Sequence, residues 1–176
     1  MNITVKDKTF TTYISSVEIQ ERIQLLGKEI SADFSDNEIT IVSVLNGSFI
    51  FTADLCRQIE GNVNIQFLRV FSYHGTASTG KITELMGLNE SLKNKHVVIV
   101  EDIIDTGLTI DYIYKSILSH EPASLKIATL LLKEDIYNGN LKIDYIGFRI
   151  PNRFVIGYGL DLDGLGRNLP EIYQAI

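Results

Sequence analysis

The sequence predicts an α/β domain in which a central, mainly parallel sheet is flanked by helices, with a small irregular subregion toward the C-terminal end. Short apolar runs alternate with helical patterns, and parallel strands need such crossover helices between them. The apolar runs are continuous, which is typical of strands buried on both faces. The 176 residues, 45% of them hydrophobic, suffice for one sizeable core. We therefore expect a single domain over residues 1–176.

The N-terminal part of the chain predicts the first helix. Ser15 and Glu18 match an S-x-x-E capping box, which satisfies two backbone N–H groups at a helix start. Apolar residues then recur at helical spacing on one face, so we expect an amphipathic helix over about 17–32. The residues before Ser15 are expected to form a short N-terminal extension.

Two strands, a second helix and a loop are expected next. The apolar run at 39–45 predicts a strand, after which Asn-Gly-Ser at 46–48 turns the chain into a helix over about 49–59. Residues 64–70 predict the following strand. The stretch at 72–81 is polar and rich in Gly, Ser and Thr, a composition that suits a mobile loop and cannot build a core.

The second half of the chain continues this alternation and then departs from it. The run at 96–103 is the clearest strand, and it leads into a helix that ends near His120. Pro122 precedes a further strand at 124–133. From Asp144 onward, short strands and turns replace the alternation, so we expect a small irregular subregion over one end of the sheet.

Composition and charge narrow the classes of function. The formal net charge of −6 opposes nonspecific binding to nucleic acid but allows a local pocket for a small phosphorylated ligand. No apolar run is long enough to span a membrane, and the first residues lack the regions of a signal peptide. We therefore expect a cytoplasmic protein that binds neither nucleic acid nor a membrane. Cys56, the only cysteine, lies in an apolar helical pattern and is expected to pack rather than react.

Residues 97–109 hold the strongest functional signal, an apolar strand that runs into acidic residues and a small turn before a helix. Ligands of open parallel sheets bind beyond the carboxyl ends of the strands, where a helix N-terminus offers free N–H groups to a phosphate. The turn from Thr106 to Thr109 would supply this cradle. Glu101 and Asp102 offer acceptors to ribose hydroxyls or to a metal-bound sugar, whereas they would repel a lone phosphate. The segment therefore favours a ligand that carries both a sugar and a phosphate.

Taken alone, these residue types leave other interpretations open. Acid-rich strand ends also occur as solvated turns, and Asp105 has the position of an ordinary helix N-cap. Lys133, at the end of a strand, could be a solvated charge, and Phe154 could be a core residue of its strand.

Three other functional motifs are excluded. The DLDGLG segment at 161–166 matches the start of haloacid-dehalogenase-like phosphatases, but that motif follows the first strand of a sheet and this one lies near the C-terminal end. An EF-hand loop would need a bidentate glutamate where Ile172 stands. A dinucleotide-binding fold would need a G-x-G-x-x-G after an early strand, and none is present.

Residues 97–109 resemble the phosphoribosyl pyrophosphate motif of the type I phosphoribosyltransferases, and VEDIIDTGLT is similar to the hypoxanthine-guanine branch of that family. The resemblance extends over about 14–167: VLNGSF resembles the pyrophosphate loop, SYHGTASTG the flexible catalytic loop, LLLKED the base-contacting strand and IPNRFVIGYGLD the C-terminal hood. It implies the type I phosphoribosyltransferase fold, with a hood built mainly from about 144–176 and the N-terminal segment. It also implies transfer of a 5-phosphoribosyl group from phosphoribosyl pyrophosphate to N9 of hypoxanthine or guanine, giving IMP or GMP and pyrophosphate in purine salvage.

The resemblance assigns the acidic segment to the sugar phosphate and to catalysis. It implies that Asp105 is the general base, which accepts the proton from N7 of the purine. Glu101 and Asp102 would bind the ribose hydroxyls, and the turn that follows would bind the 5′-phosphate. The implied phosphoribosyl-binding residues are Glu101, Asp102, Thr106, Gly107, Leu108 and Thr109.

The resemblance implies that a second group of residues binds the base. Lys133 would donate to the oxygen at C6, Phe154 would stack on the purine face, and the Val155 carbonyl would meet the other edge of the base. Asp161 would lie beside the base and reach a magnesium ion through its water shell, and Arg167 would meet pyrophosphate.

The pyrophosphate loop is implied to be Asn46, Gly47 and Ser48. This family often has a basic residue where this chain has Asn46, so we expect the loop to bind pyrophosphate through its backbone. The resemblance also implies a cis peptide bond between Leu45 and Asn46. In the flexible loop, Ser72 and Tyr73 are expected to lead a closure over the reacting sugar.

The resemblance further implies Mg²⁺ as cofactor, with Glu101, Asp102 and Asp161 as the metal-binding residues. It implies a homodimer or homotetramer whose only other partners are the 6-oxopurine base and phosphoribosyl pyrophosphate. Two alternative functions stay open: a phosphoribosyltransferase that prefers xanthine, and a non-catalytic nucleotide-sensing regulator of the same fold.

Overall fold

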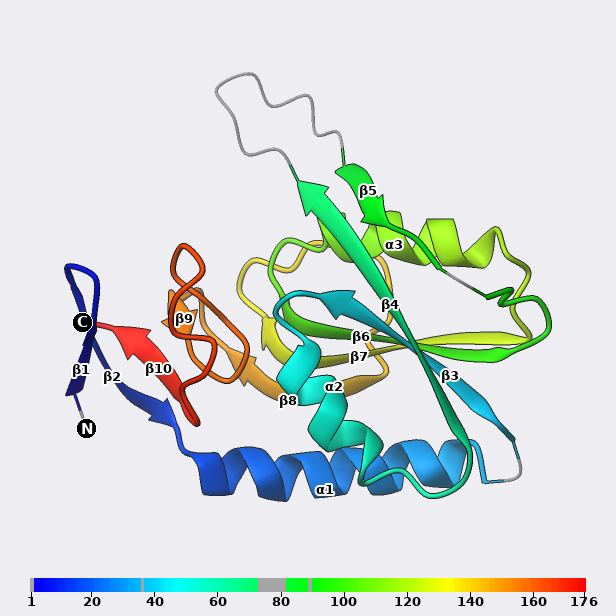
Figure 1. Ribbon diagram of the computed structural model, residues 1–176, viewed down its shortest axis with the longest axis horizontal. Helices are drawn as coiled ribbons and strands as arrows, with labels where there is room; N and C mark the ends of the chain where they lie inside the picture. Colours follow the sequence, from blue (N-terminus) through cyan, green and yellow to red (C-terminus); the bar gives the residue numbers. More distant parts are fainter. Residues whose placement is uncertain (1, 36, 73–81, 89) are drawn as a thin grey trace.

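The centre of the computed structural model, which describes residues 2–35, 37–72, 82–88 and 90–176, is a six-stranded sheet (Figure 1). Five strands run parallel in the order β4-β3-β6-β7-β8, and β5 pairs antiparallel with β4 at one edge. The strands are β3 (Ile39–Leu45), β4 (Val63–Ser72), β5 (Ile82–Met86), β6 (His96–Ile104), β7 (Ser124–Lys133) and β8 (Tyr145–Ile150). The predicted α/β class with a mainly parallel sheet is confirmed.

Helices cover both faces of this sheet. α1 (Ser16–Asp33) and α2 (Phe49–Cys56) lie on one face, and α3 (Leu108–Leu118) lies on the other (Figure 1). Successive residues of β6 face the two cores: Val98 packs with α1 and α2, and Ile99 packs with α3. This burial on both faces explains the continuous apolar runs of the strands. No helix among the described residues is long and apolar enough to cross a membrane.

The first helix begins at the predicted capping box. The Glu18 N–H donates to Ser15 Oγ at 3.4 Å, and the Ser15 N–H donates to Glu18 Oε2 at 2.8 Å. The helix spans Ser16–Asp33 and is one residue longer at each end than the predicted 17–32.

A second, four-stranded sheet joins the two ends of the chain in the order β1-β2-β10-β9, and all its pairs are antiparallel. Its strands are β1 (Asn2–Val5), β2 (Lys8–Ile14), β9 (Val155–Ile156) and β10 (Ile172–Ala175). Phe10, Ile156 and Tyr173 form a small separate core in this sheet. The two ends of the chain therefore lie side by side, beside the main sheet (Figure 1).

Several element boundaries differ from those predicted. α2 ends at Cys56 instead of about residue 59, because the chain turns at Gln58, whose N–H donates to the Leu55 carbonyl at 2.9 Å. β4 begins one residue earlier and ends two residues later than the predicted 64–70. Strands β1, β2 and β5 were not predicted, because they lie in short antiparallel pairs and lack a continuous apolar run.

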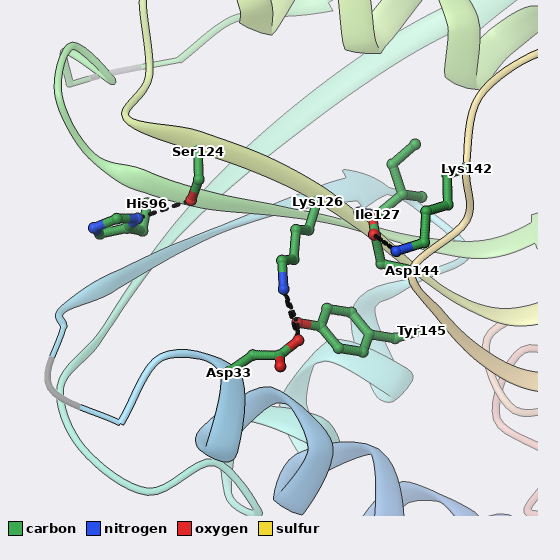
Figure 2. Close-up of polar contacts among 8 residues, drawn as sticks. All are labelled: Asp33, His96, Ser124, Lys126, Ile127, Lys142, Asp144 and Tyr145. Carbon is green, nitrogen blue, oxygen red and sulfur yellow. Dashed lines mark hydrogen bonds and ion pairs between the residues drawn. The ribbon is translucent and has the colours of Figure 1, made fainter.

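A polar cluster joins the C-terminal end of α1 to the beginnings of β7 and β8 (Figure 2). Lys126 Nζ lies 2.6 Å from Asp33 Oδ2, and the Tyr145 hydroxyl donates to the same oxygen at 2.6 Å. These donors, Lys126 first, lower the pKa of Asp33. Because the pKa is lowered on folding, the stabilisation from this carboxylate is present at neutral pH and is lost as the pH falls through the lowered value.

Tyr145→Phe should lower the free energy of unfolding by about 1 kcal/mol, because it removes a hydrogen bond to a half-exposed carboxylate while keeping the aromatic ring. Urea denaturation at pH 7 would measure the change. Tyr112→Phe, on the exposed side of α3, is the matched control and should change the stability by less than about 0.5 kcal/mol. Equal losses in the two variants would contradict the role of the contact with Asp33.

Candidate active site

A pocket of about 240 Å³ opens at the carboxyl end of β6. Its lining is the continuous segment 101–110, which runs from the end of the strand through the acidic turn into the first turn of α3. Ligands of open parallel sheets bind at this position. All the residues predicted for the phosphoribosyl group therefore line one cavity.

The turn before α3 exposes the start of the helix to this pocket. Gly107 is the N-cap of α3 and has φ +96°, a left-handed conformation that glycine adopts most easily. As a glycine, this N-cap makes no side-chain hydrogen bond to the first N–H groups of the helix, which can therefore bind an anion. Leu108, next to them, is 73% exposed. Since the N-cap is Gly107, the interpretation of Asp105 as a helix N-cap is wrong.

Glu101 and Asp102 bring two carboxyl groups to the base of the pocket. Glu101 is buried, and its Oε2 has no hydrogen-bond partner among the described residues. Burial, and then the neighbouring Asp102 carboxylate, raise the pKa of Glu101 well above its usual range. Burial also raises the pKa of Asp102, whose Oδ1 accepts from the Ile103 N–H at 2.9 Å. A buried acid and its partly buried neighbour can accept hydroxyl donors or share a cation, and either would relieve their repulsion.

Asp105 and Lys133 form an ion pair beside these acids. The register of β6 and β7 pairs Ile104 with Leu132, so the next residues, Asp105 and Lys133, lie at the same end of the sheet. Lys133 Nζ lies 2.9 Å from Asp105 Oδ1. The lysine side chain is only 12% exposed and the aspartate is 50% exposed. Lys133 is therefore not a solvated charge at a strand end.

The loop at 46–48 lies directly against the acidic pair. The Leu45–Asn46 peptide bond is cis, as the resemblance implied. A Cβ added to Gly47 would lie 1.5 Å from Asp102 Oδ2, so only a residue without a side chain allows this approach. The Ser48 hydroxyl is buried and donates to the Val44 carbonyl. Asn46 is therefore the exposed residue of the loop, whereas Gly47 and Ser48 are buried.

Arg167 and Asp161 meet on the other side of this loop. Arg167 Nη2 lies 2.6 Å from Asp161 Oδ1, and Arg167 Nη1 donates to the Gly159 carbonyl at 2.7 Å. The second carboxylate oxygen of Asp161 accepts from the Gly164 N–H at 2.6 Å. A Cβ on Gly159 would lie 2.0 Å from the Gly47 carbonyl oxygen, so the segment carrying Arg167 packs on the loop at 46–48.

Phe154 lies at the edge of the small sheet. Its side chain is 46% exposed, so the interpretation as a core residue is wrong. The ring centroid lies 6.2 Å from that of Phe10, and Lys8 Nζ lies 5.4 Å from it. These contacts with β2 were not predicted, because no local pattern links the N-terminal strand to residue 154. Val155 follows as the buried first residue of β9.

The predicted flexible loop is described only at its start. Ser72 is the last residue of β4. Tyr73 and the residues up to Lys81 lie outside the described residues. Closure of this loop stays a prediction.

The acidic side chains of the site can be compared with the ligands that a divalent cation requires. Among the described residues, no three His, Cys, Asp or Glu side chains lie close enough to hold a metal ion together. Of the three predicted ligands, Glu101 and Asp102 are adjacent, while Asp161 is engaged by Arg167. Mg²⁺ commonly binds one or two carboxylates and completes its shell with water and substrate phosphates. The unpartnered Oε2 of Glu101 therefore fits a cation shared with a phosphorylated ligand, and not one held by the protein alone.

Known proteins resemble this chain over most of its length. The family model described as phosphoribosyl transferase domain matches residues 15–163. A hypoxanthine phosphoribosyltransferase of Buchnera aphidicola is 41% identical over 171 residues, which cover 96% of this chain and 97% of that protein. A hypoxanthine-guanine phosphoribosyltransferase of Staphylococcus epidermidis is 42% identical over 160 residues, covering 90% and 89%. A solved hypoxanthine-guanine phosphoribosyltransferase of Bacillus anthracis has a TM-score of 0.90 at 40% identity, covering 94% of this chain and 98% of that one.

Proposed function

The chain belongs to the phosphoribosyl transferase domain family, and from this premise we propose that it transfers the 5-phosphoribosyl group of phosphoribosyl pyrophosphate to N9 of hypoxanthine or guanine. The products are IMP or GMP and pyrophosphate, so the reaction serves purine salvage. The observation that carries the proposal is the Asp105–Lys133 ion pair at a pocket formed by a helix N-terminus and the adjacent acids Glu101 and Asp102. This site combines a phosphate cradle, acceptors for sugar hydroxyls and a pair of groups suited to a purine.

The 5′-phosphate binds at the start of α3. The uncapped N–H groups after Gly107 and the hydroxyls of Thr106 and Thr109 donate to its oxygens. Glu101 and Asp102 accept from the ribose hydroxyls, which supply the missing partner of the buried Glu101 oxygen. The sugar phosphate is thereby held with its anomeric carbon facing the base.

Binding of the base replaces the ion pair between Asp105 and Lys133. In the structure, Asp105 and Lys133 neutralise each other at 2.9 Å. When the purine binds, Asp105 accepts the proton from N7 as the bond to N9 forms, and Lys133 donates to the oxygen at C6. Each charged group therefore has a partner both before and after binding. Phe154 stacks on the ring, and the Val155 carbonyl accepts from the other edge of the base.

Pyrophosphate leaves past the loop at 46–48. Asn46 and the backbone of Gly47 and Ser48 donate to it, and Arg167 supplies the positive side chain. The Asp161 carboxylate holds Arg167 in place through the contact at 2.6 Å.

A magnesium ion, when bound, neutralises charge on the pyrophosphate leaving group. Glu101 and Asp102 would hold it, together with oxygens of the substrate. Asp161 would not bind it directly, since one of its oxygens accepts from the Gly164 N–H and the other pairs with Arg167. The binding, orienting and proton-accepting steps belong to the protein side chains described above.

Removal of divalent cations should lower the rate of pyrophosphate release by about 100-fold, because Arg167 is the only positive side chain assigned to the leaving group. The rate would be measured in excess EDTA and again after addition of MgCl₂, which should restore it. Full activity in excess EDTA would contradict the assignment of a metal cofactor.

A substrate panel tests the proposed function. The purified protein would be assayed for pyrophosphate release with phosphoribosyl pyrophosphate, Mg²⁺ and one base at a time: hypoxanthine, guanine, xanthine, adenine or uracil. Hypoxanthine and guanine should be the best substrates. Preference for xanthine would favour the first alternative, and binding of nucleotides without release of pyrophosphate would favour a sensing regulator.

We also propose that the chain works in the cytoplasm as a homodimer or homotetramer, with all 176 residues forming one domain. The support for assembly is the family relationship. Light scattering of the purified protein would measure its mass in solution.

A further inference from the structure

We infer that Tyr137 is a positioning residue for the phosphate-binding turn, an inference that rests on the proposed function. Tyr137 lies in the segment between β7 and β8, four positions after Lys133. It does not line the pocket of residues 101–110. It acts through Gly107, the residue that begins α3.

The tyrosine ring lies directly against the glycine of the turn. A Cβ added to Gly107 would lie 2.7 Å from Tyr137 Cε2 and 3.2 Å from Cδ2, with the Gly139 Cα at 3.5 Å. A Cβ added to Gly139 would lie 2.7 Å from the Tyr137 hydroxyl oxygen and 2.8 Å from Cε2. The same ring edge therefore packs on two glycines, one of which is the N-cap of α3.

Three hydrogen bonds hold the ring and its segment in place. The Tyr137 hydroxyl donates to the Leu141 carbonyl at 2.7 Å, and the Tyr137 N–H donates to the Lys133 carbonyl at 3.0 Å. The next N–H, that of Asn138, donates to the Thr106 carbonyl at 3.4 Å. The segment therefore ties the end of β7 to the phosphate-binding turn.

This packing keeps the turn in its binding conformation before the phosphate arrives. Gly107 has φ +96° where α3 begins at the pocket, and the Tyr137 ring packs against it, so the ring limits how far the turn can move. A site that is already ordered loses less entropy on binding. Removal of the ring should therefore weaken binding of the 5′-phosphate and leave binding of the base unchanged.

The test compares three variants in the full chain. Tyr137→Ala removes the ring, and Tyr137→Phe keeps the ring but removes the hydroxyl. Tyr114→Ala is the matched control, because Tyr114 is also a partly buried tyrosine packed on the core under α3. Inhibition constants for GMP and for guanosine separate the contribution of the 5′-phosphate from that of the base and sugar. The KM for phosphoribosyl pyrophosphate, the KM for hypoxanthine and kcat would be measured on the same samples.

Tyr137→Ala should weaken inhibition by GMP about 10-fold, because the turn would have to be ordered on binding, and change inhibition by guanosine less than about 2-fold. The KM for phosphoribosyl pyrophosphate should rise by the same factor as the GMP constant, with the KM for hypoxanthine unchanged. Tyr137→Phe should retain most of the affinity for GMP, and Tyr114→Ala should leave the ratio of GMP to guanosine constants unchanged.

Equal losses for GMP and guanosine in Tyr137→Ala would show general damage and overturn the inference. Unchanged constants for both inhibitors in that variant, beside an active wild type, would also overturn it while leaving the proposed function intact. A wild-type protein that releases no pyrophosphate with any base would instead overturn the proposed function, and this inference with it.

Discussion

Adenine should be used with a kcat/KM roughly 10⁴- to 10⁵-fold below that for hypoxanthine. A lysine ammonium has three donors and no acceptor, so it satisfies the oxygen at C6 of a 6-oxopurine but meets the amino group of adenine donor to donor. Lys133 is 12% exposed, so little water reaches the ammonium to take the place of the missing acceptor. The site rejects adenine because its own polar atoms would be left unpaired.

The Lys133→Ala variant tests this assignment. It should lose kcat/KM for hypoxanthine without gaining the same amount for adenine, because the alanine offers no new acceptor. Initial rates with the two bases would measure both values. Lys142→Ala, which changes a lysine whose side chain is 85% exposed, is the control and should keep the full preference. If the wild-type enzyme used adenine as well as hypoxanthine, Lys133 would not be the residue that recognises the oxygen at C6. The same would follow if Lys133→Ala kept the full preference for hypoxanthine over adenine.

Asp105→Asn should lower kcat by roughly 10- to 1,000-fold and leave binding of phosphoribosyl pyrophosphate within a few-fold. An amide cannot accept the N7 proton at neutral pH. The substitution also removes the negative partner of Lys133, which lies 2.9 Å away and is mostly buried. Rapid-quench measurement of the first turnover would separate the chemical step from product release.

Asp111→Asn is the matched control for this variant. Asp111 also lies near the start of α3, but it pairs with the exposed Lys115 at 2.6 Å and does not line the pocket. Its substitution should leave the first turnover unchanged. Wild-type chemistry in Asp105→Asn would exclude Asp105 as the general base.

The main sheet could be predicted because its central strands are buried on both faces. The continuous apolar runs at 39–45 and 124–133 have the same bounds as β3 and β7. The phosphate pocket could be predicted because its lining is a single continuous segment, 101–110. Residues adjacent in the sequence at the end of a buried strand lie together in any parallel sheet.

Contacts between distant segments could not be predicted in the same way. The packing of Tyr137 on Gly107 depends on a turn without apolar periodicity, and the approach of Gly159 to the Gly47 carbonyl joins segments far apart in the sequence. The contact of Lys8 with the Phe154 ring likewise joins opposite ends of the described chain. Periodicity describes which face of an element is buried, but it carries no information on which distant residue covers that face.

Two close approaches also have a genetic consequence: that of Gly47 to Asp102 and that of Gly107 to Tyr137. Any change in the first or second base of a glycine codon replaces the residue with one that carries a Cβ, or ends translation. At position 47 that Cβ would fall on the carboxylate of Asp102, and at position 107 it would fall on an aromatic ring while the backbone is left-handed. Almost every coding change at these two codons is therefore harmful, whereas most exposed positions accept several amino acids. Selection for purine salvage should keep both codons among the four synonymous glycine triplets.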